Sequence, residues 1–147
     1  MKIIKVDESN IEEAGRIHSE SWKESHRSFC SEEFVEKHTP AAQTEYLRRE
    51  IAVGKRLYML IVKEAVGVVS VDGNLIENLY VLPDEQRKKY GTQLLEFAIA
   101  QCHGTPTLWI LSNNERAYDL YKKRGFVETG NRKLLREKLF EIEMSLL

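Results

Sequence analysis

The sequence contains few of the residues that mark fibrous, disordered or disulfide-stabilised chains. Among its 147 residues are two cysteines, three prolines and eight glycines. Cys30 and Cys102 lie far apart and form no CxxC motif, so the sequence supports neither a disulfide framework nor a metal site. Both thiols are expected to be small buried side chains. Collagen-like and low-complexity architectures are excluded by the same composition.

Long apolar runs and an excess of one charge are also missing. No stretch approaches the roughly 20 apolar residues that a membrane-spanning helix needs, and the first ten residues contain acidic positions that interrupt any signal-type apolar region. The 22 Lys and Arg residues nearly balance the 23 Asp and Glu residues. Because binding to bulk nucleic acid needs a broad basic excess, neither a nucleic acid nor a membrane is an expected partner. The expected location is the cytoplasm.

The hydrophobic content, 42%, and the length predict one globular domain over residues 1–147. Apolar residues at three- and four-residue steps predict that the first third is mainly helical. The segments expected there are a strand at residues 2–6 and helices at residues 11–25, 31–37 and 40–52. The polar residues 7–10 are suited to cap the first of these helices.

Runs of β-branched and aromatic residues predict an antiparallel meander in the middle of the chain. Its strands are expected at residues 56–62, 65–71 and 74–82. The last two are joined by Asp72-Gly73, a strong hairpin signal because glycine accepts the positive φ of a tight turn.

The remaining segments alternate between helix and strand. They are a helix at residues 92–102, a strand at 106–112, a helix at 114–124 that ends at Gly125, and a strand at 138–146. A buried strand reached through a helix forms a parallel crossover pair, so the strands at 74–82 and 106–112 are predicted to be parallel neighbours. The fold class is therefore α/β with a mixed sheet.

The turn at residues 82–92 leaves a strand and opens a helix, which is the setting of an anion site. Unpaired backbone N–H groups at a helix start attract phosphate, and Arg87, Lys88 and Lys89 add positive charge. The alternative is a solvated basic turn. The turn is neither a Walker loop nor a dinucleotide fingerprint, because Gly91 is its only glycine.

Two motifs in this half of the chain resemble those of the GNAT superfamily of N-acetyltransferases. Asn114, Ala117, Tyr121 and Gly125-Phe126 match the pattern N-x-x-A-x-x-x-Y-x-x-x-G-F. The earlier turn is similar to the pyrophosphate loop Q/R-x-x-G-x-G/A, with Gln86 first, Gly91 last and Lys89 in place of the first glycine. The resemblance covers about residues 74–127.

The resemblance implies a three-layer fold, in which helices cover both faces of a mixed, mostly antiparallel sheet of six or seven strands. It also implies acetyl-CoA as the acetyl donor. The implied pantetheine contacts are Leu79, Tyr80, Val81 and Asn114, and the implied pyrophosphate contacts are Gln86, Arg87, Lys88, Lys89, Tyr90, Gly91 and Thr92. A simple helix N-cap is the alternative role for Asn114.

The implied reaction is direct attack of a primary amine on the acetyl thioester. Tyr121 would protonate the leaving sulfur, and backbone N–H near Val81 would stabilise the oxyanion. Glu77, expected on the same face of its strand as Leu79 and Val81, would accept the proton of the amine through water. The alternatives are a core tyrosine for Tyr121 and a half-exposed polar position for Glu77.

The acceptor is expected to contact the helical first third through Trp22, His26 and Phe29. The alternatives, which are more common for such residues, are core packing for Trp22 and Phe29 and a surface or structural position for His26. A small amine is favoured over a protein acceptor. The basic residues Arg132, Lys133, Arg136 and Lys138 would attract an acidic acceptor or form a solvated loop.

Three further alternatives stay open. One is an acyl-CoA-binding or sensing module without turnover, and another is an acyl donor of different length. The third is a homodimer in which the final strand adds to the sheet of a partner.

Overall fold

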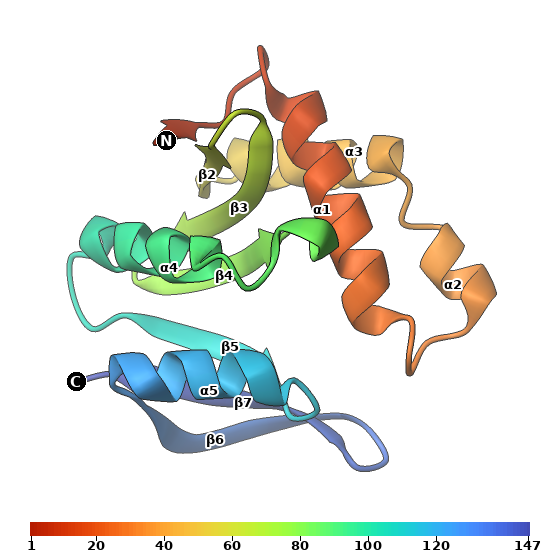
Figure 1. Ribbon diagram of the computed structural model, residues 1–147. Helices are drawn as coiled ribbons and strands as arrows, with labels where there is room; N and C mark the ends of the chain where they lie inside the picture. The colour runs from red at the N-terminus through yellow and green to blue at the C-terminus, as the bar shows by residue number, and fades with distance from the viewer.

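One seven-stranded sheet crosses the computed structural model, which describes residues 1–147 (Figure 1). In the sheet, the strands lie in the order β1-β2-β3-β4-β5-β7-β6. Their bounds are β1 (Lys2–Lys5), β2 (Arg56–Ile61), β3 (Ala65–Asp72), β4 (Leu75–Val81), β5 (Thr107–Leu111), β6 (Phe126–Arg136) and β7 (Leu139–Leu146). Every pair is antiparallel except β4 and β5. The mixed sheet and its parallel pair are therefore confirmed.

Helices cover both faces of this sheet and complete the three layers. They are α1 (Ile11–His26), α2 (Glu32–Glu36), α3 (Pro40–Ala52), α4 (Tyr90–Gln101) and α5 (Glu115–Arg124), with a short 3₁₀ turn, η1 (Pro83–Glu85). One buried cluster joins α1 and α3 to β2 and β3, and another joins α4 and α5 to the opposite face. None of these helices is long and apolar enough to span a membrane.

Local sequence signals explain most of the element boundaries. The turn between β3 and β4 places Gly73 at a φ of 62°, as the Asp-Gly pair predicts. Helix α3 begins with Pro40 and is capped by Thr39, whose hydroxyl accepts from the amide of Ala42 at 3.1 Å. Helix α5 ends at Gly125, which has a φ of 113°.

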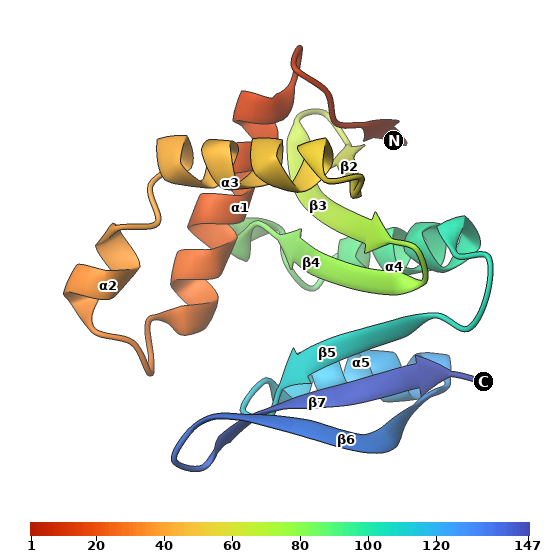
Figure 2. The ribbon, with the colours of Figure 1, turned by 180° about the vertical axis from the view of Figure 1, so that it is seen from behind.

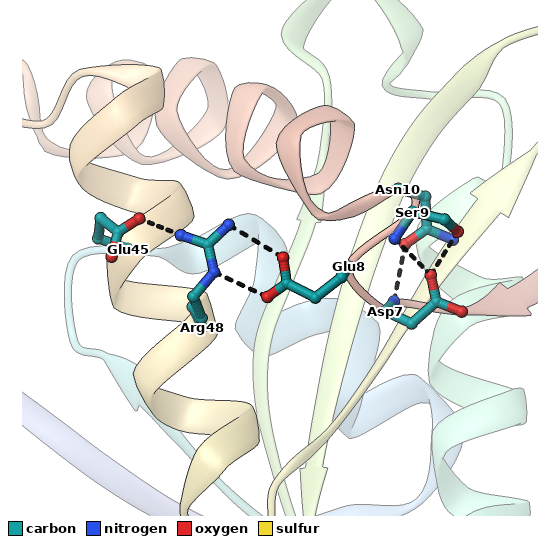
Figure 3. A network of polar contacts seen from close by, with 6 residues as sticks. All are labelled: Asp7, Glu8, Ser9, Asn10, Glu45 and Arg48. Carbon is teal, nitrogen blue, oxygen red and sulfur yellow. Dashed lines mark hydrogen bonds and ion pairs between the residues drawn. The ribbon is translucent and has the colours of Figure 1, made fainter.

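The polar residues 7–10 do not cap α1 as predicted, and other contacts hold the start of this helix (Figure 3). Asn10 occupies the N-cap position, but its side chain accepts from the amide of Asp7 at 2.8 Å and does not cap the helix. Beside it, Arg48 of α3 makes a two-pronged ion pair with Glu8, with Nε to Oε1 at 2.8 Å, and a second pair with Glu45. These contacts attach the start of α1 to α3.

The expectations for the C-terminal region were wrong in two respects. The basic residues Arg132, Lys133 and Arg136 belong to β6 and not to a loop. Sequence patterning missed this strand because Phe126 is its only buried residue, so no apolar alternation marks it. In addition, β7 lies between β5 and β6, so the final strand has no free edge to add to the sheet of a partner.

Candidate active site

The parallel strands β4 and β5 are paired only at their beginnings. The register contains two pairs, Leu75 with Thr107 and Ile76 with Leu108. Beyond them the ribbons diverge, as Figure 2 shows. A cleft of about 620 Å³ occupies this region, and its walls come from α1, β4, β5, α5 and the turn before α4.

A β-bulge shapes the β4 wall of the cleft. Val68 pairs with Tyr80 and Ser70 with Glu77, so two residues of β4, Asn78 and Leu79, lie opposite one residue of β3. Asn78 has a φ of 52°. The bulge interrupts the alternation of side chains, so residues before and after it do not follow the simple two-residue rule.

Two backbone positions of β4 face the gap between the strands. The amide of Leu82 donates to the carbonyl of Val66 at 2.9 Å, which makes this a hydrogen-bonded pair. Because such pairs alternate with non-bonded ones in an antiparallel ladder, the N–H and C=O groups of Leu79 and Val81 point away from β3, toward β5. Those of Tyr80 point to β3, contrary to the expectation that its backbone is free to bind a ligand. The Tyr80 side chain still lines the cleft.

The turn before α4 holds a row of free amides at one end of the cleft. The backbone N–H groups of residues 87–92 donate to no acceptor within the protein, and the first amide of the helix that does donate is that of Gln93, to Lys89. Arg87 and Lys89 adopt left-handed conformations, with φ values of 69° and 66°. Alternating conformations of this kind make successive amides converge on an anion.

The side chains of this turn divide into two groups. The side chains of Arg87, Lys89, Tyr90 and Thr92 and the backbone of Gly91 line the cleft. Lys88 lies outside it, paired with Glu85 at 2.8 Å. Gln86 ties the turn to its surroundings. Its amide nitrogen donates to the carbonyl of Val81 at 3.1 Å, and its oxygen accepts from Arg116 at 2.8 Å. Sequence analysis missed Arg116, which lines the cleft from α5 and belongs to no motif.

Asn114 stands at the start of α5 on the rim of the cleft. Its side-chain oxygen accepts from the amide of Ala117 at 3.1 Å, so it is the N-cap of the helix. The cap uses only the oxygen, and the side-chain nitrogen has no partner within the protein. A contact of Asn114 with pantetheine stays a prediction.

Tyr121 projects from α5 into the floor of the cleft. Its side chain is 8% exposed and packs against Phe126, with ring centroids 5.9 Å apart. Burial raises the pKa of Tyr121 to about 12, so the phenol is neutral over the physiological range. Its hydroxyl makes no hydrogen bond within the protein. Tyr121 is thus both a core residue and a free donor in the cleft.

Glu77 lies on the other face of β4 from Leu79 and Val81, and the expectation of a shared face was wrong. Its carboxylate lies 3.0 Å from Lys55 Nζ, which also donates to Glu50 of α3 at 2.7 Å. Leu79 and Val81 pack toward α4 instead. The reversal follows from the bulge at Asn78. Glu77 nevertheless lines the cleft.

Lys55 carries the positive charge in this group of side chains. Burial lowers the pKa of Lys55, but its interactions with the carboxylates of Glu50 and Glu77 outweigh the burial and hold the pKa above its usual value. Tyr46 completes the group by donating to Glu50 at 2.9 Å. Sequence analysis identified neither Lys55 nor Glu50, because they approach Glu77 only through folding.

This arrangement matches a known family. The model of the acetyltransferase (GNAT) domain matches residues 23–147, which is most of the chain. The protein belongs to the GNAT acetyltransferase family. A comparison with curated proteins finds no match.

Solved structures share the GNAT fold over nearly the whole chain. The PaiA N-acetyltransferase of Thermoplasma acidophilum, in complex with coenzyme A, is 21% identical with a TM-score of 0.70, covering 97% of this chain and 96% of that one. YjaB of Escherichia coli, in its apo form, is 21% identical with a TM-score of 0.77 and coverages of 99% and 97%. Another is yncA of Salmonella typhimurium with its cofactor acetyl-CoA, 17% identical with a TM-score of 0.69 and coverages of 99% and 92%. At these identities the likeness shows the fold alone.

The three residues expected to contact the acceptor of this GNAT protein are not equivalent. His26 lines the cleft, whereas Trp22 and Phe29 do not. Trp22 stacks between His26 and His38, at centroid distances of 4.0 and 3.5 Å, and so supports the wall from behind. Phe29 lies under Arg136, which donates to its carbonyl at 2.8 Å. This contact connects the end of α1 to the β6–β7 hairpin.

The left-handed residue in the GNAT turn gives a stability prediction. Lys89 has a φ of 66°, which costs a non-glycine residue about 1 kcal/mol. Replacement by glycine (Lys89→Gly) is expected to raise the free energy of unfolding by about that amount relative to Lys89→Ala, because only glycine relieves the strain. Urea denaturation measures the difference. Lys88→Gly is the control, since the φ of Lys88 is negative, and it should not stabilise. Equal stability of the two Lys89 variants would show that the turn is unstrained.

Proposed function

We propose that this GNAT protein is an N-acetyltransferase that moves the acetyl group of acetyl-CoA directly to a primary amine of a small molecule. The observation that carries the proposal is a coincidence of two features at one cleft. The separated strands β4 and β5 leave the backbone of Leu79 and the N–H of Val81 open to the cleft, whereas the carbonyl of Val81 is bonded to Gln86. The row of free amides at residues 87–92 lines the same cleft.

The chemistry of these donors fits acetyl-CoA. An extended chain that contains amides pairs with a free strand edge in the manner of an added strand, which suits pantetheine beside Leu79 and Val81. A diphosphate suits the amides of residues 87–92, where Arg87, Lys89 and Arg116 add three positive charges to the lining. When bound, acetyl-CoA supplies an activated acetyl thioester.

The residues of the cleft then have separate tasks. The amide of Val81 is directed into the gap and donates to the carbonyl oxygen as negative charge develops there. The neutral phenol of Tyr121 donates its proton toward the leaving sulfur. The nitrogen–carbon bond forms, the carbon–sulfur bond breaks, and the sulfur leaves as a thiol with the proton of Tyr121. The ammonium loses two protons: one passes through Glu77 or water to solvent, and the other restores the phenol of Tyr121.

A thiol-release assay with a panel of amines tests this proposal. The expected result is thiol release that depends on both acetyl-CoA and an amine, with the acetylated amine identified by mass spectrometry. Binding of coenzyme A with no transfer to any amine would contradict the proposal and support the acyl-CoA-binding module. Preferential transfer of a longer acyl group would show that the donor is a longer acyl-CoA and not acetyl-CoA.

A further inference from the structure

The two ends of the cleft differ in charge. The turn and the start of α5 contribute the Lys and Arg residues of the lining, which are Arg87, Lys89 and Arg116. Glu85, the acidic residue of the lining beside this turn, is paired with Lys88 at 2.8 Å. The other end is bounded by the last turns of α1 and by β4. The residues of α1 that line this end carry hydrogen-bonding side chains and are Ser21, Glu24, Ser25 and His26. Ser28, just beyond the end of α1, also lines it. This end contains the carboxylates of Glu24 and Glu77 and no free Lys or Arg side chain.

Ser21 is the exception among the serines of this wall. It is 4% exposed, lines the cleft, and its hydroxyl has no hydrogen-bond partner within the protein. Ser25, one turn later, donates to the carbonyl of Trp22 at 3.0 Å and is satisfied. A buried hydroxyl without a partner is unfavourable. The Ser21 hydroxyl is therefore placed to bond a molecule in the cleft.

A second unsatisfied oxygen faces the same end. Glu77 Oε1 lies 3.0 Å from Lys55 Nζ, yet it is buried and makes no aligned hydrogen bond. Lys55 is shared between Glu77 and Glu50, so this group of three side chains keeps a net negative charge. A cation with N–H donors would balance this charge and add an aligned hydrogen bond to the Glu77 carboxylate.

The positive side chains nearest this end are already engaged. Arg27 pairs with Glu24 at 3.7 Å, Arg136 donates to the carbonyl of Phe29, and Lys55 has its two carboxylates. Lys133 lies over the ring of Trp109, 4.2 Å from its centroid. A carboxylate on the acceptor would therefore enter without a partner, beside Glu77. Repulsion of this kind discriminates strongly against the wrong ligand.

We infer that Ser21 and Glu77 form an acceptor subsite for a hydrophilic aliphatic amine that has no carboxylate beside its nitrogen. The ammonium donates to Glu77, and Ser21 bonds the nitrogen or a neighbouring polar group. This inference rests on the proposed function, because the nitrogen so held is the one that attacks the thioester. Ser21 acts by binding the acceptor and not by transferring a proton.

Three amines of similar basicity separate the alternatives in a thiol-release assay. Ethanolamine fits the subsite, glycine adds a carboxylate beside the amine, and benzylamine replaces the polar group by an apolar ring. At a fixed saturating acetyl-CoA concentration, kcat/KM for ethanolamine is expected to exceed that for each of the other two by about tenfold or more. Equal or better use of glycine would overturn the subsite.

Replacement of Ser21 by alanine tests the residue itself. Ser21→Ala is expected to raise KM for ethanolamine about tenfold with little change in kcat, as the loss of one hydrogen bond to a charged group predicts. The control is Ser145→Ala, which removes another buried hydroxyl, bonded to Thr107 at 3.1 Å on β5 and remote from α1. It should leave KM unchanged.

The outcomes distinguish the subsite from the proposed function. An unchanged KM in Ser21→Ala, with active acetyl transfer, would overturn the subsite and leave the transferase function intact. Binding of coenzyme A with no acetylation of ethanolamine would overturn the subsite, and only the absence of transfer to every amine of the wider panel would overturn the transferase function as well.

Discussion

Replacement of Tyr121 by phenylalanine (Tyr121→Phe) is expected to lower kcat about 100-fold, the lower end of the range for general acid catalysis. The variant loses only the hydroxyl that faces the cleft, and the ring keeps its place in the core. The dissociation constant of coenzyme A should change less than about twofold, and stability by less than about 0.5 kcal/mol, because the hydroxyl has no partner in the protein. Thiol-release kinetics and calorimetry measure these quantities.

Tyr118 provides a matched control on the same helix. Its hydroxyl donates to Glu128 at 2.7 Å, on the side of α5 away from the cleft. Tyr118→Phe therefore removes a hydroxyl from α5 without changing the cleft, and its kcat should equal that of the unmodified protein. Equal turnover of both variants would remove Tyr121 from the proposed role.

Acidification is expected to destabilise the protein through His18, which lies buried between α1 and β4. Its ring is 3% exposed and meets Tyr80 edge-on at 4.9 Å. Neither ring nitrogen has an aligned hydrogen bond. Burial lowers the pKa of His18 to about 4, and the nearby side-chain amides of Asn78 and Gln43 only partly oppose this shift.

The sign of the effect follows from proton uptake. The unfolded chain protonates His18 near pH 6.5, and the folded protein does so only near pH 4, so the unfolded state binds more protons between these values. The contribution to stability is present above pH 6.5 and is lost as the pH falls toward 4. The loss is about 3 kcal/mol, from a difference of about 1.4 kcal/mol per pH unit.

A variant without the buried histidine isolates this contribution from that of the carboxylates. The free energy of unfolding is measured by urea denaturation between pH 7 and 4 for the unmodified protein and for His18→Gln. The unmodified protein should lose about 3 kcal/mol more than the variant over this range. His103→Gln, at an exposed position, should follow the unmodified protein. Parallel curves for His18→Gln and the unmodified protein would show that the buried ring does not control acid stability.

Much of the fold follows from local sequence because local and global signals agree. The meander of β2, β3 and β4, the Asp-Gly hairpin and the crossover through α4 each have a strong local signature. Strand β6 has none. It is an edge strand with almost every side chain exposed, and pairing with β7 alone determines its conformation. The position of β7 inside the sheet could not be inferred without β6.

The sequence predicted the turn of the site but not the side chains that come from other segments, for a similar reason. The turn at residues 86–92 is one continuous segment, so its motif and its amides are visible in the sequence. Glu77 was assigned to the wrong face because the bulge at Asn78 depends on pairing with β3, and residues 74–82 read as one regular strand. Ser21, Lys55 and Arg116 approach the cleft from three different segments, and no spacing along the chain connects them.

Amide hydrogen exchange followed by NMR, with and without coenzyme A, tests the central claim most directly. The claim is that the gap beside β4 binds the pantetheine chain while the turn before α4 binds the diphosphate. Addition of coenzyme A should slow exchange at Leu79 and Val81, whose amides point away from β3, and at residues 87–92, whose amides have no acceptors within the protein. ATP should not protect β4. Binding of coenzyme A with no protection of these amides, or with protection confined to another part of the sheet, would contradict the account.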